Sequence, residues 1–458
     1  MGLAMIKQAF NRLWNDERGN MLVLAGAALP LLVGSAGLAT DTIQWTLWKR
    51  QLQRAADSAA LAGVYERISS SGSAAGVPAT VAHDLEINLH SSVDLKSGYP
   101  ELAYPADSGN KLHQVQVTLA AEKALSFSSM FITPPTITAI ATAASVPGSG
   151  EYCVVSLENS AGKSGITIGG NAKIDMNCGM ISNSPATNSA LSNGTSSSVK
   201  ATVIAAVGGV EASNRWTVDS YEPYSSALAD PYADKPIPTP GSCGNFPSAN
   251  DLDFTSNPDH ASGKVVCYKS EMKIQGTVKL GPATYILDAA SLKMSASAAS
   301  LSCDGCTIIL TSSTAATNPS SIGTVAISGG SLNLKAPTSG TYAGMALFQD
   351  RRALDSAGSN IVNGNSGSVV QGVMYFPGQE LTYNGDGITT AVCTQFVARR
   401  VVFGGNNTTT NKFEKGSNCG LLGLGTIGGG RRPRLVARSC ASTVWRPTIA
   451  VPRSSNSR

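Results

Sequence analysis

The chain has 458 residues, enough for two or three domains, and only 14% of them are charged and 6% aromatic. Gly, Ser, Ala, Thr and Asn dominate its middle part, which argues against a helical enzyme core and suits β-structure with many turns. The net charge is +4, but from Lys415 onward there are eight basic residues and no acidic one, so residues 1–414 carry −4. Nucleic-acid binding needs a basic face on the folded part, and we expect no nucleic-acid partner.

An uncharged apolar stretch, NMLVLAGAALPLLVGSAGLA, occupies residues 20–39. A helix of twenty residues is about 30 Å long, which matches the hydrocarbon thickness of a bilayer. We therefore predict a transmembrane helix at residues 20–40 that follows a cytoplasmic head at residues 1–19. A cleaved signal peptide, with its cleavage site at Gly37-Leu38-Ala39, is the alternative.

The charges near the span do not fix its orientation, because three basic residues precede it and three follow it. The cysteines decide the matter. All nine lie between Cys153 and Cys440, and eight paired cysteines with one left over fit four disulfides in an oxidising compartment. The long C-terminal part is therefore expected outside the cytoplasm.

Residues 41–68 predict an amphipathic juxtamembrane helix that continues the span without a break. Its apolar face is formed by residues that recur at steps of three and four, namely Trp48, Leu52, Ala55, Ala59 and Gly63. Small side chains let a partner element approach this face closely. The sequence leaves open whether the partner belongs to an assembly or to the same chain.

The N-terminal sequence resembles that of Flp pilus-assembly TadE/TadG-like proteins, especially the TadG-like branch. The shared features are an Arg-Gly step at Arg18, an Ala/Leu/Gly span, an Asp just outside it at Asp41, and the string LQRAADSAALA at residues 52–62. The last string is the most specific of these. The similarity extends over residues 10 to about 425.

With the span and the cysteines, the sequence predicts a single-pass protein of the bacterial inner membrane with its C-terminal region in the periplasm, and the resemblance places the protein in the cell envelope. The resemblance implies a structural part in building or anchoring the tight-adherence pilus. The implied partners are the inner membrane and other pilus-assembly proteins, without enzymatic activity, cofactor or small-molecule substrate.

Two departures from the family pattern matter. Prepilin-like relatives carry a Glu a few residues into the span, whereas residues 20–24 read NMLVL, so processing by a prepilin peptidase is not expected. Some TadG-like proteins carry an Asp-x-Ser-x-Ser metal motif, which this sequence lacks, so no metal site is expected.

After the helix, residues 69–80 predict a flexible linker and residues 81–146 a small α/β segment. Within that segment, residues 112–121 alternate apolar and polar side chains, as a half-buried strand does. Residues 135–146 are a second strand candidate, rich in Thr, Ile and Ala.

Residues 150–425 predict a β-rich extracytoplasmic domain. Short β runs such as Thr277–Leu280 recur between Gly-Gly, Asn-Gly and Ser-Gly turns. Many small strands with such corners favour a right-handed parallel β-helix, and a β-sandwich is the alternative. Residues 230–240 contain four prolines and predict a boundary between two lobes.

Disulfides are expected between neighbouring coils. The predicted pairs join Cys153 with Cys178, Cys243 with Cys267, and Cys393 with Cys419. Cys303 and Cys306 form a Cys-Asp-Gly-Cys motif. A small structural disulfide is favoured there over a redox site, which wants a thioredoxin-like context, or a zinc site, which wants two more ligands.

An enzyme that cleaves polysaccharide is the main alternative function, because parallel β-helices often bind or cleave such polymers. The best catalytic candidate is Asp350-Arg351-Arg352, with Asp355 nearby. One Asp beside two Arg more often forms a salt-bridged loop, so no catalytic residue is predicted. A secreted or surface β-helix that binds or cleaves glycans is nevertheless kept as the second hypothesis.

The C-terminal residues 426–458 are basic and unlike all that precedes them. We predict that they form a disordered tail.

Overall fold

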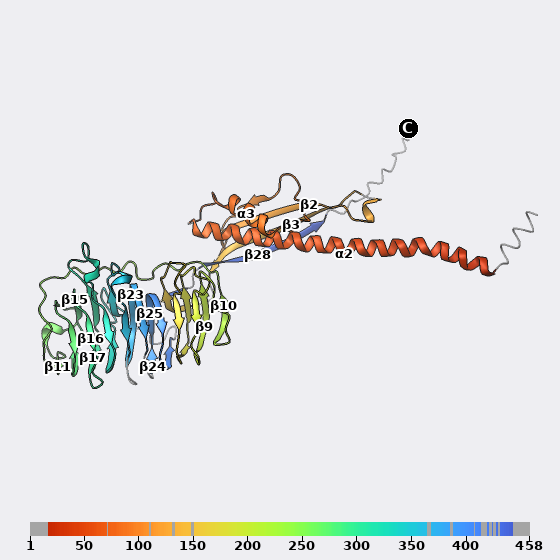
Figure 1. Ribbon diagram of the computed structural model, residues 1–458. Helices are drawn as coiled ribbons and strands as arrows, with labels where there is room; N and C mark the ends of the chain where they lie inside the picture. The colour runs from red at the N-terminus through yellow and green to blue at the C-terminus, as the bar shows by residue number, and fades with distance from the viewer. Residues whose placement is uncertain are drawn as a thin grey trace, which may run out of the picture. The chain divides into compact units, whose positions relative to one another are not determined.

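The computed structural model describes residues 17–442, apart from short gaps at 71, 110, 131–132, 148–150, 364–367, 385–387, 407, 414–418, 421–423, 425–426 and 429–430. The chain divides into two compact units (Figure 1). Unit 1 contains residues up to 146 and from 433 onward, and unit 2 contains residues 147–432. The N-terminal apolar helix and the mainly β outer region that the sequence predicts are both present.

The described part of unit 1 contains two α-helices, a short 3₁₀ helix and one sheet. Helix α2 (Glu17–Ser69) is followed by α3 (Val77–Asn88). The four-stranded sheet has the order β1-β2-β3-β28, with β1 (Glu101–Ala103), β2 (Leu112–Glu122), β3 (Thr136–Pro147) and β28 (Arg431–Ser442). β1, β2 and β3 pair antiparallel, and the short helix η1 (Ser128–Met130) lies in the β2–β3 connection. α3 begins inside the predicted linker.

The core of unit 1 lies between the sheet and the C-terminal half of α2. Alternate residues of β2 point inward, so that Val115, Val117 and Leu119 are buried. They pack with the small side chains of α2 in one hydrophobic core. A Cβ atom at Gly63 would lie 2.9 Å from a methyl carbon of Val115, so the sheet approaches the helix as closely as glycine allows.

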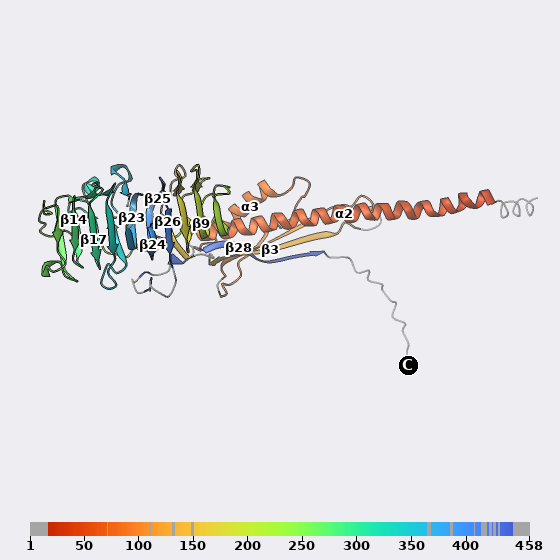
Figure 2. The same ribbon diagram turned by 90° about the horizontal axis from the view of Figure 1, so that it is seen from below.

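The sheet covers α2 only from Gly37 onward. α2 and β2 run in opposite directions. Phe127, which follows β2, lies against Gly37 near the start of the covered part of α2, and the Lys123 Nζ lies 5.9 Å from the Trp48 ring. At the other end, Arg67 donates a hydrogen bond to the carbonyl of Gln114. The part of α2 before Gly37 extends beyond the strands (Figure 2).

Unit 2 is built almost entirely from short strands. Its strands are β4 (Glu151–Ser156), β5 (Ile166–Ile168), β6 (Lys173–Met176), β7 (Gly179–Ser182), β8 (Ala190–Ser192), β9 (Ser198–Ala206), β10 (Trp216–Glu222), β11 (Leu252–Asp253), β12 (Val265–Tyr268), β13 (Met272–Ile274), β14 (Thr277–Leu280), β15 (Thr284–Asp288), β16 (Leu292–Met294), β17 (Ser300–Asp304), β18 (Thr307–Thr311), β19 (Val325–Ile327), β20 (Ser331–Lys335), β21 (Met345–Gln349), β22 (Asn360–Val362), β23 (Val369–Tyr383), β24 (Ile388–Val392), β25 (Thr394–Phe403), β26 (Thr408–Lys412) and β27 (Ile427–Gly428). Three single-turn helices interrupt them: η2 (Pro258–His260), η3 (Pro319–Ser321) and η4 (Asp355–Ala357).

Apart from the antiparallel pair of β27 with β4, the described strands of unit 2 pair in parallel, and most of them pair with the strand three positions further along the chain. β11, β14, β17 and β20 form one such series, and β12, β15, β18 and β21 form another. Equivalent residues therefore stack, as Val278, Leu301 and Leu332 do in the first series, and all three are buried. The β-sandwich that the sequence left as an alternative does not fit this pairing, because sandwich sheets are antiparallel.

The order of strands in space differs from their order in the chain. The first strand of unit 2, β4, does not lie at an end of the stack: β25 pairs in parallel with β4 and β5, and β26 pairs with β6. The chain runs from β4 outward to β10, then resumes at β11, and the later strands return to β4 (Figure 1). We call this meeting of the last and first strands the seam.

Residues 223–251 connect β10 to β11. We call the proline-rich residues 230–240 within this connection the strap. The predicted boundary between two lobes at this place is wrong, because residues 147–432 form one compact unit whose two strand groups join at the seam. Prolines suit the strap because they lock an extended backbone and remove hydrogen-bond donors that no strand would satisfy.

The C-terminal tail is partly ordered, so the prediction of disorder for residues 426–458 is wrong for its first part. β28 is the edge strand beside β3, Leu435 and Cys440 pack on the core of unit 1, and Arg438 Nε lies 3.2 Å from an Asp57 carboxylate oxygen on α2. Residues 443–458 lie outside the described part of the chain. Sequence periodicity gave no sign of this strand because its arginines mask the alternation.

Replacing Leu435 with Asp should destabilise unit 1 by about 1–2 kcal/mol, because it places a charge where a partly buried Leu packs. Ala437→Asp, at an exposed position of the same strand, is the matched control and should change stability little. Thermal unfolding of both full-length variants in detergent measures the difference. Equal unfolding of the two variants would mean that β28 contributes nothing to the core of unit 1.

Candidate functional site: the N-terminal helix and the charged clusters

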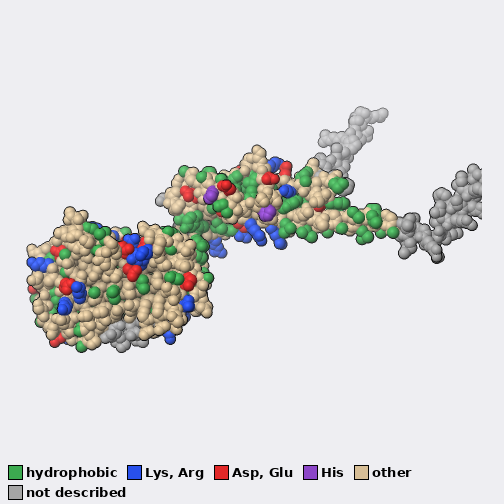
Figure 3. Space-filling model, in the orientation of Figure 1, with side chains coloured by type: hydrophobic (Ala, Val, Ile, Leu, Met, Phe, Trp, Pro, Cys, Tyr) green, Lys and Arg blue, Asp and Glu red, His purple; other side chains and the backbone are tan. Residues whose placement is uncertain are grey.

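The N-terminal part of α2 is apolar, and we call it bare because no other part of the described chain covers its side chains from Ala25 to Ala36. No charged residue lies between Arg18 and Asp41, and the described side chains from Ala25 to Ala36 are exposed except at Gly34; Leu31 is 75% exposed. Figure 3 shows hydrophobic side chains along this extension. By length and composition the helix is able to cross a membrane, and a signal sequence shares these two properties.

Asp41 marks the end of the bare part and is only 2% exposed. Its carboxylate accepts hydrogen bonds from the backbone N–H of Phe127, at 3.1 Å, and from the hydroxyl of Ser128, at 2.6 Å. Burial raises the pKa of Asp41, but the hydrogen bonds from Ser128 and Phe127 outweigh it and hold the pKa below its usual value. Asp41 therefore fastens the β2–β3 connection to α2 as a carboxylate.

Gly37 lies one helical turn before Asp41 and faces the same connection. A Cβ atom at this position would lie 2.5 Å from the Phe127 ring, so any side chain would displace the ring. Gly37 and Asp41 together form the docking point of the β2–β3 connection on α2.

The predicted helix face is packed inside unit 1. Leu52, Ala55 and Ala59 are at most 1% exposed, Gly63 contacts Val115 and the α3 residues Val77 and Val81, and Trp48 packs beside the same core. The sequence left open whether this helix face packs within the chain or against another protein. In the structure it packs within the chain.

The cysteines lie in the pairs that the sequence predicts. Cα–Cα distances are 5.8 Å for Cys153–Cys178, 4.6 Å for Cys243–Cys267 and 5.1 Å for Cys393–Cys419. Cys440 is the free thiol among the described residues. Three of these bridges therefore join strands or loops about 25 residues apart in sequence, which is one coil of the stack.

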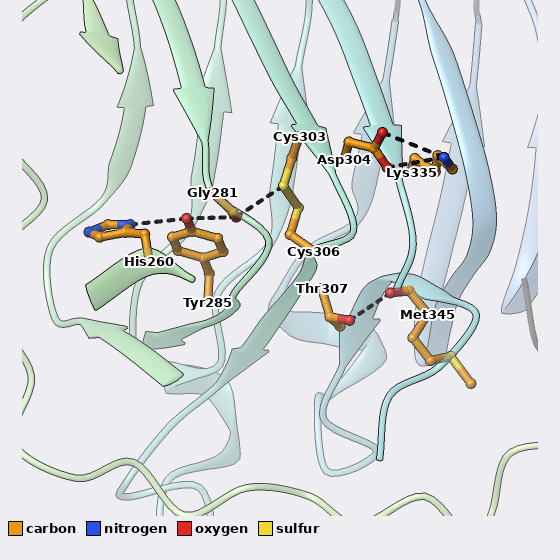
Figure 4. The surroundings of a disulfide bond; sticks show 9 residues. All are labelled: His260, Gly281, Tyr285, Cys303, Asp304, Cys306, Thr307, Lys335 and Met345. Atoms are coloured by element: carbon orange, nitrogen blue, oxygen red, sulfur yellow. Dashed lines mark hydrogen bonds and ion pairs between the residues drawn. A yellow bond between two sulfur atoms is a disulfide. The ribbon is translucent and has the colours of Figure 1, made fainter. Parts of the chain in front are cut away.

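The Cys-Asp-Gly-Cys motif forms the fourth bridge, with a Cα–Cα distance of 6.0 Å. Cys303 is 5% and Cys306 1% exposed, so neither sulfur is open to a substrate. His260 lies nearby (Figure 4) but its Nδ1 is 3.0 Å from the Tyr285 hydroxyl. Within the described ranges, no three His, Cys, Asp or Glu side chains are grouped as a metal site would need.

The catalytic candidates are occupied by ion pairs. Asp350 is fully buried and is held by Arg352, whose Nη2 lies 2.6 Å away, and by the Thr311 hydroxyl at 2.7 Å. Burial raises the pKa of Asp350, but these hydrogen bonds lower it more, and the net pKa is lower than usual. Asp355 pairs with Arg400. The group therefore has the geometry of salt-bridged loops.

Glu158 is the centre of a charged cluster that sequence reasoning missed. Its side chain is fully buried, with Arg400 Nη1 at 2.7 Å and Arg399 Nε at 3.1 Å from one carboxylate oxygen. Arg400 also contacts Asp355 at 2.5 Å and Glu380 at 3.0 Å. Because Glu158 follows β4 and the two arginines lie on β25, the cluster lies on the seam.

The charged cluster keeps Glu158 ionised. Burial raises the pKa of Glu158, but hydrogen bonds from Arg399, Arg400 and the Ser160 backbone outweigh burial and lower the pKa to about 2 from 4.5. Its hydrogen bond to Asp355, with those to Glu158 and Glu380, raises the pKa of Arg400 above its usual value. Two adjacent arginines within a strand otherwise rich in Val and Phe were the available sequence signal.

Arg351 holds the strap, a role that the sequence also did not reveal. Its guanidinium donates to the carbonyls of Tyr232 and Lys235, the latter at 2.8 Å, and to the Tyr375 hydroxyl at 2.9 Å. Tyr375 in turn donates to Asp230. Arg351 therefore joins the first half of the strap, residues 230–235, to Tyr375 of β23.

Comparison with known proteins gives one family. Residues 19–69 match the family model described as "Putative Flp pilus-assembly TadE/G-like". Searches of curated proteins and of solved structures gave no match. The matched residues coincide with α2, so the family resemblance rests on the same helix that carries the bare extension, Asp41 and the packed face.

Glu158→Gln should lower stability at neutral pH by roughly 3 kcal/mol, which is the free-energy equivalent of the pKa shift. A depressed carboxyl pKa stabilises the folded state above the unfolded value of 4.5, and that contribution is lost as the pH falls to about 2. The stability gap between wild type and Glu158→Gln should therefore close between pH 4.5 and 2.

Denaturant unfolding of the full-length protein across this pH range measures the gap. Asp304→Asn removes an exposed ion pair with Lys335 and should change stability by less than about 1 kcal/mol at every pH. A gap for Glu158→Gln that stays constant down to pH 2.5 would show that the charge of Glu158 is not the cause.

Arg351→Ala should release the strap and speed chymotrypsin cleavage at Tyr232, because the loss of Arg351 removes its hydrogen bonds to the strap carbonyls. Lys235→Ala is the control, since it removes one exposed contact, from Nζ to the Thr341 carbonyl. Fragment patterns on a gel follow the cleavage. Equal rates for the two variants would argue against the clamp.

Proposed function

We propose that the protein is a membrane-anchored structural component of tight-adherence (Flp/Tad) pilus assembly or related envelope machinery, of the TadG-like branch. In this proposal α2 crosses the inner membrane once and the rest of the chain lies in the periplasm. Other pilus-assembly proteins are its partners. The family match of residues 19–69 supports the pilus-assembly role.

One observation carries the anchoring. The apolar half of α2 is bare, whereas the other half is built into the core of unit 1. Cleavage after Ala39 would remove Gly37, against which Phe127 packs, and would leave Asp41 beside a new chain end. A signal sequence does not need to fit the mature fold, and this helix does, which favours a retained anchor.

We further propose that unit 2 is a right-handed parallel β-helix that serves as a stiff periplasmic module. The parallel pairing of strands three apart supports it, and parallel crossover connections are nearly always right-handed. Oxidised cysteines suit the periplasm, because disulfides persist in that compartment. In the described residues the charged clusters are satisfied internally, which supports a structural part over a catalytic one.

The anchor can be tested with paired charge substitutions. Leu31→Arg with Leu32→Arg puts two charges in the middle of the span, at about 2.5–3.5 kcal/mol each on the insertion scale, and should shift protein from the carbonate-resistant membrane fraction. Ile43→Arg with Leu47→Arg, at exposed positions beyond the span, is the matched control and should stay in the membrane.

The topology and the function need two further measurements. A C-terminal reporter that is active only in the periplasm should be active, and deletion of the gene should abolish pili without loss of any glycan activity. A soluble or secreted fragment that begins near Thr40 would instead support a secreted glycan-binding protein. Normal pili after deletion would contradict the assembly role.

A further inference from the structure

We propose that the β2–β3 connection, in its described residues 124–130 and 133–135, is a second membrane contact of this protein. Its partner is the lipid surface of the bilayer that α2 crosses, at the boundary between headgroups and acyl chains. The inference rests on the proposed function, because it takes α2 as the membrane anchor.

The first support is where the connection is held. Phe127 lies against Gly37, and the backbone and hydroxyl of Ser128 donate to Asp41. These contacts fix the connection beside the last residues of the uncharged stretch that ends before Asp41. Its depth is therefore set by the helix that would be in the membrane.

The second support is the length of α2 before Gly37, which is no longer than the hydrocarbon part of a bilayer is thick. The uncharged part of α2 before Gly37, residues 19–36, contains eighteen residues, which is about 27 Å of helix and is close to the hydrocarbon thickness. If this part fills the bilayer, the contact at Gly37 falls at its surface. A longer bare helix would have held the connection away from the lipid.

The third support is the chemistry of the connection. The sequence has no charged residue from 124 to 150, so no ion is dehydrated when the connection approaches lipid. Met130 at its tip is 75% exposed, and a free apolar side chain gains by leaving water. On the adjoining helix Leu38 is 56% exposed.

The charged residue next to the connection lies on the side away from the span. Lys123 directly follows β2, and its Nζ lies 5.9 Å from the ring of Trp48, about three helical turns beyond Gly37. The order along α2 is therefore apolar span, apolar connection, then aromatic and basic residues.

A lipid partner accounts for these observations better than a protein partner does. Met130 in the connection and Leu38, which follows the residue that Phe127 packs against, are both exposed apolar side chains, and one lipid surface would cover both. Two contacts also restrain tilt and rotation of the helix, which a single span leaves to its anchoring residues.

The test places an environment-sensitive NBD dye at single sites of the full-length protein, with Cys440→Ala removing the free thiol. Met130→Cys reports on the connection. Ile87→Cys is the matched control, an apolar residue 67% exposed on α3; the neighbouring Asn88 contacts Ser58, about 30 Å along α2 from Gly37. Leu32→Cys reports on the span.

The labelled proteins are placed in vesicles of phosphatidylethanolamine and phosphatidylglycerol, with and without nitroxide-labelled lipid as quencher. We expect emission from Met130→Cys to be blue-shifted and to lose several-fold more intensity to the quencher than emission from Ile87→Cys. Emission from Leu32→Cys should be quenched as well.

Two results would overturn the inference while leaving the anchor intact. With Leu32→Cys quenched, a Met130→Cys signal that resembles Ile87→Cys would place the connection in water. A blue shift without quenching would mean that protein, not lipid, covers it. If Leu32→Cys is itself unquenched, α2 does not span the membrane, and both the proposed function and this inference fail.

Discussion

The rest of unit 1 depends on one constraint, which is that a single helix has one half inside a protein core and an apolar half without protein cover. From Leu52 to Val64 its small residues are covered by strands and α3, whereas from Ala25 to Ala36 its apolar side chains have no protein cover. The change occurs at Gly37 and Asp41. A glycine admits the Phe127 ring, and a carboxylate satisfies backbone N–H groups that would otherwise be unpaired at the edge of the fold.

The second unit is an insertion in the sheet of the first. The chain leaves unit 1 after β3 and returns as β28, which is the neighbour of β3 in the sheet. This path requires the two ends of unit 2 to lie close together. They do, because its last strand β27 pairs with its first strand β4. The seam between β25 and β4 makes that closeness possible. A stack that began at one end and finished at the other would leave its two chain ends far apart.

Sequence reasoning predicted what local pattern controls. The span, the strand at residues 112–121 and the short β runs of unit 2 follow from hydrophobic period and turn residues, and cysteines one coil apart follow from the repeat. It failed where the information is not local. The sequence around Arg431 does not indicate that these residues pair with β3. The sequence around Pro231 does not indicate that the strap lies along strands of one unit, where a boundary between two lobes was expected. Glu158 has no unusual neighbours in sequence, because its partners lie more than 240 residues away.

The charged cluster at the seam joins strands that are far apart in the sequence, so short connections do not fix their pairing. Coils of a parallel stack resemble one another, so an apolar face on β25 would pack on several coils about equally well. Buried ion pairs contribute little net stability, but a misplaced coil would leave Glu158 buried without its arginines, at a cost of several kcal/mol. The cluster therefore selects the one arrangement in which β4 receives β25. Where neighbours in space are also neighbours in sequence, as for Val278 and Leu301, short connections enforce the register and aliphatic side chains are sufficient.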